Sequence, residues 1–98
     1  MKSEFRAAKS FRKDYKKLSA KEIEETDSVI KKLLSGKTLE EKYRDHALHG
    51  NYKGYRECHI FSDLLLVYKK LSTEELLVLT VYRISSHTNI FDISKSKK

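Results

Sequence analysis

The strongest constraint on the fold is the apolar run from Leu64 to Tyr68, Leu-Leu-Leu-Val-Tyr, in which no polar residue alternates with the apolar ones. A strand with one face in water alternates with a period of two residues, so this run predicts a strand covered on both faces. We therefore expect residues 64–71 to form a central strand, with helices covering one face of its sheet.

Two further strand-like runs lie on either side of this one in the sequence, at 52–61 and 76–84. Short polar connections separate the three runs, Ser62-Asp63 on one side and residues 72–75 on the other. Because short connections join antiparallel neighbours, the sequence predicts an antiparallel meander.

Two helices are predicted between residues 10 and 36. The apolar stripe of the first consists of Phe11, Tyr15 and Leu18. Ser19 and Glu22 have the spacing of a capping box, which predicts that the second helix begins there. The apolar stripe of the second consists of Ile23, Thr26, Ile30, Leu33 and Leu34. Gly36 can adopt the left-handed conformation that ends a helix, so we expect a two-helix hairpin.

The remaining segments carry weaker patterns. Residues 3–8 are expected to form a short first strand, 37–50 a connection over the surface, and 85–93 a turn or short helix. The polar, basic end at 94–98 is expected to be a flexible tail. Together the elements predict an α+β fold in one domain spanning 1–98, a length typical of a single core.

The charge and the cysteine content narrow the classes of function. The chain of 98 residues has a net charge of +7 and a pI near 9.5, which favours a polyanionic partner such as a nucleic acid. The single cysteine, Cys58, cannot form an internal disulfide and is expected to point into the core. We find no secretory signal and no apolar run of about 18 residues. We therefore expect a cytoplasmic protein without a membrane partner.

Residues capable of acid–base chemistry gather at one end of the predicted sheet. Alternation along the strand 52–61 places His59 on the same face as Tyr55. Asp63 follows in the turn, and the antiparallel order brings Arg83 and His87 to the same end as Asp63. The sequence thus predicts a cluster of histidine, aspartate and arginine.

Such a cluster suits cleavage of RNA without a metal ion. The 2′-hydroxyl can attack its own phosphate if a base removes its proton, an acid protonates the leaving oxygen and a cation stabilises the crowded phosphate. Histidine serves as acid or base near neutral pH. Arg83 would hold the phosphate with two hydrogen bonds, and Phe91 or Tyr55 would stack on a base.

Each residue also has an ordinary structural interpretation. A histidine at a strand end is often only exposed, Asp63 can simply form the turn, Arg83 can pair with a surface acid, and Phe91 can fill the core. A zinc site made of Cys58, His59, His46 and His49 is excluded, because adjacent strand residues face opposite ways and the metal-binding spacings are missing. No metal or other cofactor is expected.

Four blocks of sequence, taken together, resemble the RelE superfamily of bacterial toxins, and within it the YafQ-like mRNA interferases. The blocks span 45–50 (DHALHG), 52–59 (YKGYRECH), 63–68 (DLLLVY) and 83–91 (RISSHTNIF). The basic segment 9–18 resembles the first helix of the family. The resemblance implies a RelE-like fold: an N-terminal strand, a two-helix hairpin, and an antiparallel sheet with the active site on its open face.

The resemblance also implies an activity and its residues. A toxin of this kind is an endoribonuclease that cleaves translated mRNA on the ribosome, stops translation and growth, and is inhibited by a cognate antitoxin. The catalytic positions carried over by matching the blocks are His46, His59, Asp63 and His87. The RNA-binding positions are expected to be Lys53, Tyr55, Arg56, Arg83 and Phe91.

Two departures from the family pattern stand out, and two alternative functions stay open. Leu64 stands where some relatives have a tryptophan that could stack on a base, and the chain continues for seven residues after Phe91.

One alternative is a ParE-like toxin that binds DNA gyrase without cutting RNA, although such relatives lack this histidine cluster. The other is an RNA-binding domain without catalysis.

Overall fold

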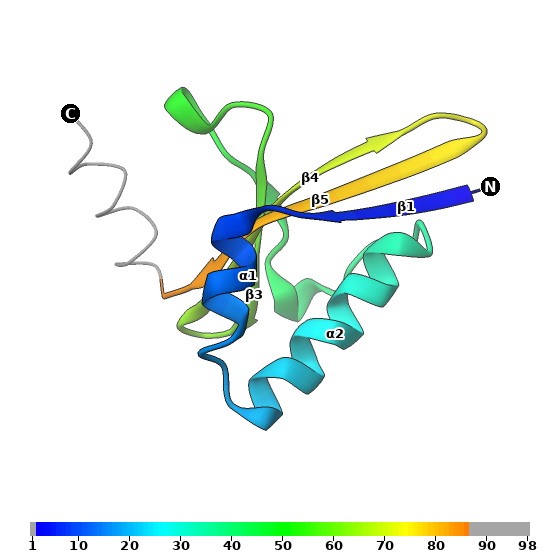
Figure 1. Ribbon diagram of the computed structural model, residues 1–98. Helices are drawn as coiled ribbons and strands as arrows, with labels where there is room; N and C mark the ends of the chain where they lie inside the picture. Colours follow the sequence, from blue (N-terminus) through cyan, green and yellow to red (C-terminus); the bar gives the residue numbers. More distant parts are fainter. Residues whose placement is uncertain (1, 87–98) are drawn as a thin grey trace.

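Residues 2–86 are described by the computed structural model shown in Figure 1. Five strands form one sheet in the order β1-β5-β4-β3-β2. β1 is parallel to β5, and the other neighbouring strands are antiparallel. The strands are β1 (Lys2–Ala7), β2 (His46–Ala47), β3 (Arg56–Phe61), β4 (Leu64–Ser72) and β5 (Leu76–Ser85). The predicted α+β fold and its meander β3-β4-β5 are confirmed.

β4 lies between β3 and β5, and all five residues of its apolar run are buried. The first, third and fifth pack into the main core beneath the helices; they are Leu64, Leu66 and Tyr68. Leu65 and Val67 point to the opposite face, where Leu48 and Tyr55 pack against them. The prediction of a central strand covered on both faces is therefore confirmed.

Both helices, α1 (Lys9–Tyr15) and α2 (Ala20–Leu34), lie on one side of the sheet, and the segment around residue 50 lies on the other (Figure 1). α1 ends at Tyr15, so Leu18 lies beyond it, although it still packs against the core. Within residues 2–86, neither helix has the length and apolarity needed to cross a membrane.

The predicted start and end of α2 are confirmed. The Ser19 Oγ accepts a hydrogen bond from the Glu22 backbone N–H at 3.2 Å, and the Glu22 carboxylate accepts one from the Ser19 N–H at 2.8 Å. Gly36 follows the helix with φ of 82°, a conformation that favours glycine. The buried residues of α2 are Thr26, Val29, Ile30 and Leu33. The predicted stripe is therefore confirmed at three positions; it omitted Val29, and its members Ile23 and Leu34 are only half-buried.

The connection at 37–50 is more ordered than the sequence predicted. It contains a short 3₁₀ helix, η1 (Glu41–Tyr43), and the strand β2. Leu39 and Tyr43 are only 7% and 3% exposed, so the connection contributes to the core and does not simply lie over the surface.

The strand predicted at 52–61 begins only at Arg56. A second 3₁₀ helix, η2 (Gly50–Tyr52), stands before it, and Gly54 has φ of 96°. A positive φ turns the chain out of the extended conformation, which explains why the first four residues of the prediction were wrong.

The first strand is confirmed at Lys2–Ala7, and two side chains join it and α1 to the rest of the fold. Ser3 Oγ donates a hydrogen bond to the Leu34 carbonyl at 2.7 Å, and Ser10 Oγ donates one to the Tyr82 carbonyl at 2.6 Å. A turn or short helix was predicted over 85–93. Ser85 is instead the last residue of β5, and the rest of this prediction from residue 87 onward lies outside the described residues. The tail predicted at 94–98 also lies outside them.

The capping box makes a prediction about stability. We expect Ser19→Ala to lower the free energy of unfolding by about 1 kcal/mol, because the first turn of α2 loses a partner for a backbone N–H. Thermal unfolding followed by circular dichroism would show the melting temperature falling by about 4–8 °C. Ser28→Ala, inside the same helix, is the matched control and should not destabilise, since alanine favours helices. An equal loss in both variants would contradict the role of the cap.

Candidate functional site

The face of the sheet opposite the helices carries the two histidines that lie among the described residues and were predicted to be catalytic. The ladder places His46 of β2 opposite Glu57 of β3, and His59 opposite Leu65 of β4. Since directly opposed residues point to the same face, these side chains share the face on which Leu48 and Tyr55 pack.

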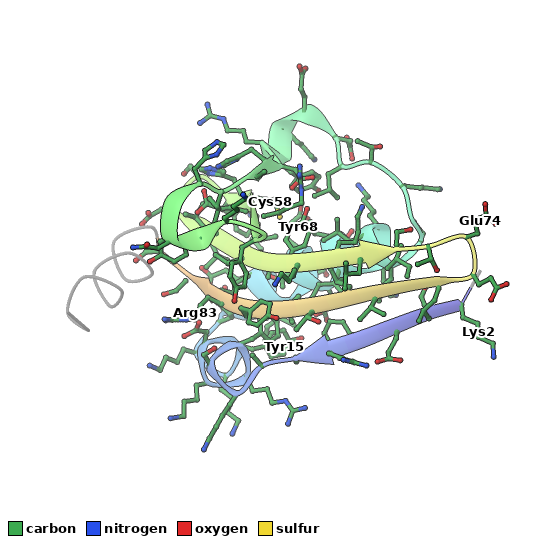
Figure 2. All side chains as sticks on the ribbon, turned by 90° about the horizontal axis from the view of Figure 1, so that it is seen from above. Lys2, Tyr15, Cys58, Tyr68, Glu74 and Arg83 are labelled. Atoms are coloured by element: carbon green, nitrogen blue, oxygen red, sulfur yellow. The ribbon has the colours of Figure 1, made fainter. Side chains whose placement is uncertain are left out.

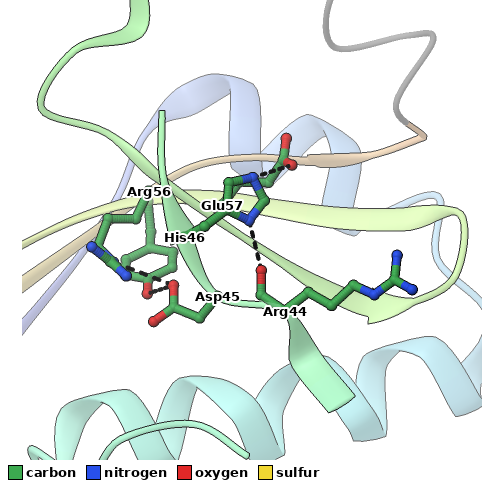
Figure 3. Close-up of polar contacts among 6 residues, drawn as sticks. Arg44, Asp45, His46, Arg56 and Glu57 are labelled. Carbon is green, nitrogen blue, oxygen red and sulfur yellow. Dashed lines mark hydrogen bonds and ion pairs between the residues drawn. The ribbon is translucent and has the colours of Figure 1, made fainter. Parts of the chain in front are cut away.

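Both ring nitrogens of His46 have an acceptor nearby (Figure 3). Nδ1 lies 2.6 Å from the Arg44 carbonyl oxygen, and Nε2 lies 3.3 Å from the Glu57 Oε1. A carbonyl only accepts, so Nδ1 carries a proton. The geometry can therefore hold a protonated, positively charged His46 with both N–H groups satisfied.

Glu57 is a buried carboxylate beneath an exposed histidine. Its side chain is 5% exposed, while that of His46 is 49% exposed. The second oxygen of Glu57 has no hydrogen-bond partner among residues 2–86. The alternation along the strand that places His59 on the open face places Glu57 there too. Its burial carries no sequence signal, because acidic residues of strands are mostly exposed.

The rings of His46 and His59 face one another across the edge of the sheet. Their centroids are 6.4 Å apart and the rings are tilted by 37°. Of the four predicted catalytic residues, the structure thus brings two together. His49, in contrast, is exposed and precedes η2, outside this pair.

Asp63 occupies the turn between β3 and β4 and is exposed. It lines a depression at the start of α2, together with Ser19 and Lys21, whereas His59 lines a different cavity. Phe61 and Ser62 border both. The predicted partners His87 and Phe91 lie outside the described residues.

Arg83 makes an ion pair with Asp14 of α1. Its Nε and Nη2 donate to the two Asp14 oxygens at 2.7 and 3.2 Å, and the Ile84 N–H donates to Asp14 at 3.0 Å. Figure 2 shows Arg83 at the end of the sheet away from Lys2 and Glu74. Two of the guanidinium's donor nitrogens, Nε and Nη2, are therefore engaged within the protein and not directed at a ligand.

The other predicted RNA-binding residues differ in their surroundings. Lys53 is exposed. Tyr55 packs edge-on against Tyr82 with centroids 4.9 Å apart, and Lys69 Nζ lies 4.9 Å from the centre of its ring. Arg56 is half-buried, and its Nε donates to Asp45 at 3.3 Å. Among the predicted RNA-binding residues that the structure describes, Lys53 is thus exposed and the others are half-buried.

Asp45 connects this surface to the core. It accepts hydrogen bonds from Arg56 and from the hydroxyl of the buried Tyr68 (Figure 3). Burial and the bond to Asp45 raise the pKa of Tyr68, so its hydroxyl stays a donor. Burial likewise raises the pKa of Cys58, whose side chain lies in the core as predicted.

An open cavity of about 400 Å³ lies beside His59, between η1, α2 and the end of β3. Lys42, Arg44 and Phe61 line it along with Tyr43 and Glu25. No sequence pattern assigned a role to Lys42 or Arg44, although Arg44 directly precedes the Asp45-His46 pair. Arg44 adopts φ of 49°, a left-handed conformation for which its residue type gives no signal.

Among residues 2–86, no three histidine, cysteine, aspartate or glutamate side chains are grouped so as to hold a metal ion. The described surface therefore offers acid–base and cationic groups: two histidines, a buried carboxylate and nearby lysine and arginine side chains.

Residues 3–92 match the family described as bacterial toxin of type II toxin–antitoxin system, YafQ. The chain is 43% identical over 61 residues to a putative toxin YafQ of Haemophilus influenzae, covering 62% of this chain and 60% of the relative. It is 41% identical over 49 residues to the mRNA interferase toxin YafQ of Escherichia coli K12, covering 50% and 49%. These alignments span less than two thirds of either relative.

A solved structure is also similar along most of its length. It is the E. coli DinJ–YafQ toxin–antitoxin complex, with a TM-score of 0.78 and 26% identity. The similarity covers 93% of this chain and 99% of the matched one.

The cavity wall makes a prediction about alkaline pH. Tyr43 donates to Glu25 at 2.7 Å, and this bond together with burial raises the pKa of Tyr43 to about 12. The unfolded chain loses the phenol proton near the ordinary pKa of about 10, while the folded protein keeps it. Tyr43 therefore stabilises the fold fully below pH 10, and this contribution is lost as the pH rises toward 12, by at most about 1.4 kcal/mol per pH unit.

Tyr43→Phe removes this titration. Urea unfolding at several pH values between 9 and 12 should show the stability of the wild-type protein falling more steeply than that of the variant. The other tyrosines are present in both proteins, so they cancel in the comparison. Parallel curves for the two proteins would show that the Tyr43–Glu25 bond does not hold the proton.

Proposed function

The chain belongs to the YafQ family of bacterial type II toxin–antitoxin toxins, and on this premise we propose that it is an endoribonuclease that cleaves mRNA on the ribosome. The proposal includes a metal-independent mechanism in which the 2′-hydroxyl attacks the adjacent phosphate. Cleavage would stop translation and growth in the bacterial cytoplasm.

The observation that carries the proposal is the pair of imidazoles, His46 and His59, 6.4 Å apart on the open face. RNA transesterification needs a base for the 2′-hydroxyl and an acid for the leaving oxygen, and two histidines near one phosphate can supply both. Lys42 and Arg44 lie along the same cavity as His59, where their positive charge would hold the RNA backbone close to the two histidines.

The contacts of His46 suggest how the roles divide. With its two nitrogens directed at Arg44 and Glu57, His46 suits a fixed, positively charged position beside the phosphate. We assign proton transfer at the 2′-hydroxyl to His59, which lines the cavity. Asp63 and His87 complete the proposed catalytic set, Asp63 by orienting a histidine and His87 by transferring a proton.

The proposed RNA-binding surface contains four of the five predicted residues, and the contacts of the fifth, Arg83, favour another role. Lys53 contacts phosphate, and Arg56, Tyr55 and Phe91 stay in the proposed surface. Arg83 is expected to act mainly through its ion pair with Asp14, which fixes the end of β5 just before residue 87.

Two partners belong to the proposal, the ribosome and a cognate antitoxin. A relative is named an mRNA interferase toxin, and a structural neighbour forms a complex with the antitoxin DinJ. The net charge of +7 suits binding both to ribosomal RNA and to an acidic antitoxin segment.

We expect His59→Ala and His46→Ala to slow cleavage, each by about 10²- to 10⁴-fold, because each removes one acid–base or cationic group. His49→Ala is the matched control: His49 lies three residues from His46, is exposed and should leave cleavage unchanged. The measurement is primer extension on an mRNA undergoing translation in a cell-free system, with new 5′ ends within codons as the readout. His87→Ala, tested in parallel, should resemble His59→Ala.

Two results would count against this proposal. If the wild-type protein produces no new 5′ ends while translation continues, the nuclease function is wrong, and gyrase binding becomes the next test. If all four histidine variants cut mRNA as fast as the wild-type protein, cleavage does not depend on these imidazoles.

A further inference from the structure

The cavity beside His59 combines the two kinds of group that bind a nucleotide. Phe61 forms part of its wall and is 37% exposed, while Lys42 and Arg44 bring two positive charges. An aromatic ring can stack on any base, and cations bind its phosphate. The volume of about 400 Å³ lies within the range of about 300–1,000 Å³ found for small-molecule sites.

The sheet geometry explains why Phe61 lies at the surface. The pairing of β3 with β4 shifts register between His59 and Phe61, an irregularity that can re-aim a side chain. Leu64, its partner across the turn, is 7% exposed and packs in the core. The exposed aromatic ring at this end of β3 is therefore Phe61, two residues from His59.

The outer edge of β3 has no strand partner next to this cavity in the part of the chain that the structure describes. β2 pairs only with Arg56 and Glu57, so within residues 2–86 no strand runs along β3 from Cys58 to Phe61. An uncovered strand edge presents backbone N–H and C=O groups to a ligand. A sugar or a base edge can therefore find hydrogen-bond partners in this part of the cavity.

Arg44 connects the cavity to the histidine pair. Its carbonyl accepts from His46 Nδ1 at 2.6 Å, and the residue lines the cavity. One carboxylate opposes the positive charge there, Glu25, and its Oε2 accepts a hydrogen bond from the Tyr43 hydroxyl at 2.7 Å. Among the described residues that line the cavity, two cations against one acid leave the wall positive, as an anionic ligand requires.

We propose that this cavity is a subsite for the RNA nucleotide next to the cleaved phosphate, with Phe61 stacking on its base and Arg44 and Lys42 binding its distal phosphate. The inference rests on the proposed function, because the nucleotide is defined by the bond that is cut. Stacking on Phe61 strengthens binding of any base, so the subsite adds affinity more than sequence preference.

The test is a binding measurement on the full chain. The probe is a short fluorescein-labelled RNA with every 2′-hydroxyl methylated, which cannot be cleaved because the nucleophile is blocked. It is used free in solution and also placed as the A-site codon of programmed ribosomes. Fluorescence anisotropy gives the Kd for the free RNA, and co-sedimentation of the protein with the ribosomes gives the Kd for the A-site form.

We expect Phe61→Ala to raise the Kd by about 5- to 150-fold, the effect of losing one base–aromatic stack. Phe61→Trp should restore binding, because it keeps a stacking ring. Phe5→Ala is the matched control: Phe5 is 44% exposed on β1, away from the cavity, and its loss should leave the Kd within about twofold of wild type.

Arg44→Gly tests the phosphate contact. Glycine tolerates the positive φ and keeps the carbonyl that holds His46, so only the guanidinium is lost. The variant should bind more weakly. Its plot of log K against log salt should be less steep by about 0.7, the value for one contact to single-stranded RNA. Arg12→Ala, on the exposed side of α1, controls for the loss of one positive charge elsewhere.

The subsite and the proposed function can fail separately. Phe61→Ala binding as tightly as Phe5→Ala, or no binding of wild type to either probe, would overturn the subsite even if wild type cuts translated mRNA. Binding that depends on Phe61 in a protein that produces no new 5′ ends would support the subsite and overturn the nuclease. Thermal unfolding of each variant shows whether it is folded, and recovery in Phe61→Trp separates stacking from damage to the fold.

Discussion

Burial of both faces of β4 is the constraint on which the rest of the structure depends. The helices cover one face, which leaves Leu65 and Val67 to be covered on the other. Removing such a side chain from water contributes about 1.5–3 kcal/mol. The cover comes from Leu48 and Tyr55, which both belong to the segment between β2 and β3. This segment must therefore fold back over the sheet, and in doing so it sets His46 opposite Glu57.

Asp45 converts this arrangement into a fixed position for His46. Adjacent residues of an extended chain point to opposite faces. Asp45 accepts a hydrogen bond from Tyr68, a residue of the main core, while His46 lies over Glu57 on the open face. A polar bond to the buried central strand thus holds the backbone at the residue just before the histidine. Hydrogen bonds to a charged group contribute about 1.5–3 kcal/mol, enough to keep this short strand in place.

The parts of the fold that were predicted correctly follow from local rules. The capping box at Ser19 needs only a three-residue spacing, and Gly36 needs only a helix before it. The burial of β4 follows from a missing alternation. The prediction of a strand from residue 52 was wrong because Gly54 takes a positive φ, which composition permits but does not require.

The site was predictable only in part. Alternation along β3 places His59 on the open face, but His46 was reached only through the resemblance to a family, since no local pattern marks it. The ion pair of Arg83 with Asp14 joins residues 69 apart in sequence, so no local pattern around either residue predicts it. The left-handed conformation of Arg44 also has no signal in the sequence, because it is imposed by the turn after η1 and not by the residue type.

Glu57 shows how this site relates to the stability of the fold. Moving a carboxylate out of water costs several kcal/mol unless partners compensate. Here one oxygen lies 3.3 Å from a half-exposed histidine, and the other has no partner within residues 2–86. Among the described residues this pairing is incomplete, so burial of the carboxylate is only partly compensated there. The carboxylate oxygen lies 3.3 Å from His46 Nε2, so it helps to orient the ring. In the proposed function, this carboxylate beneath His46 serves to position the histidine on the open face.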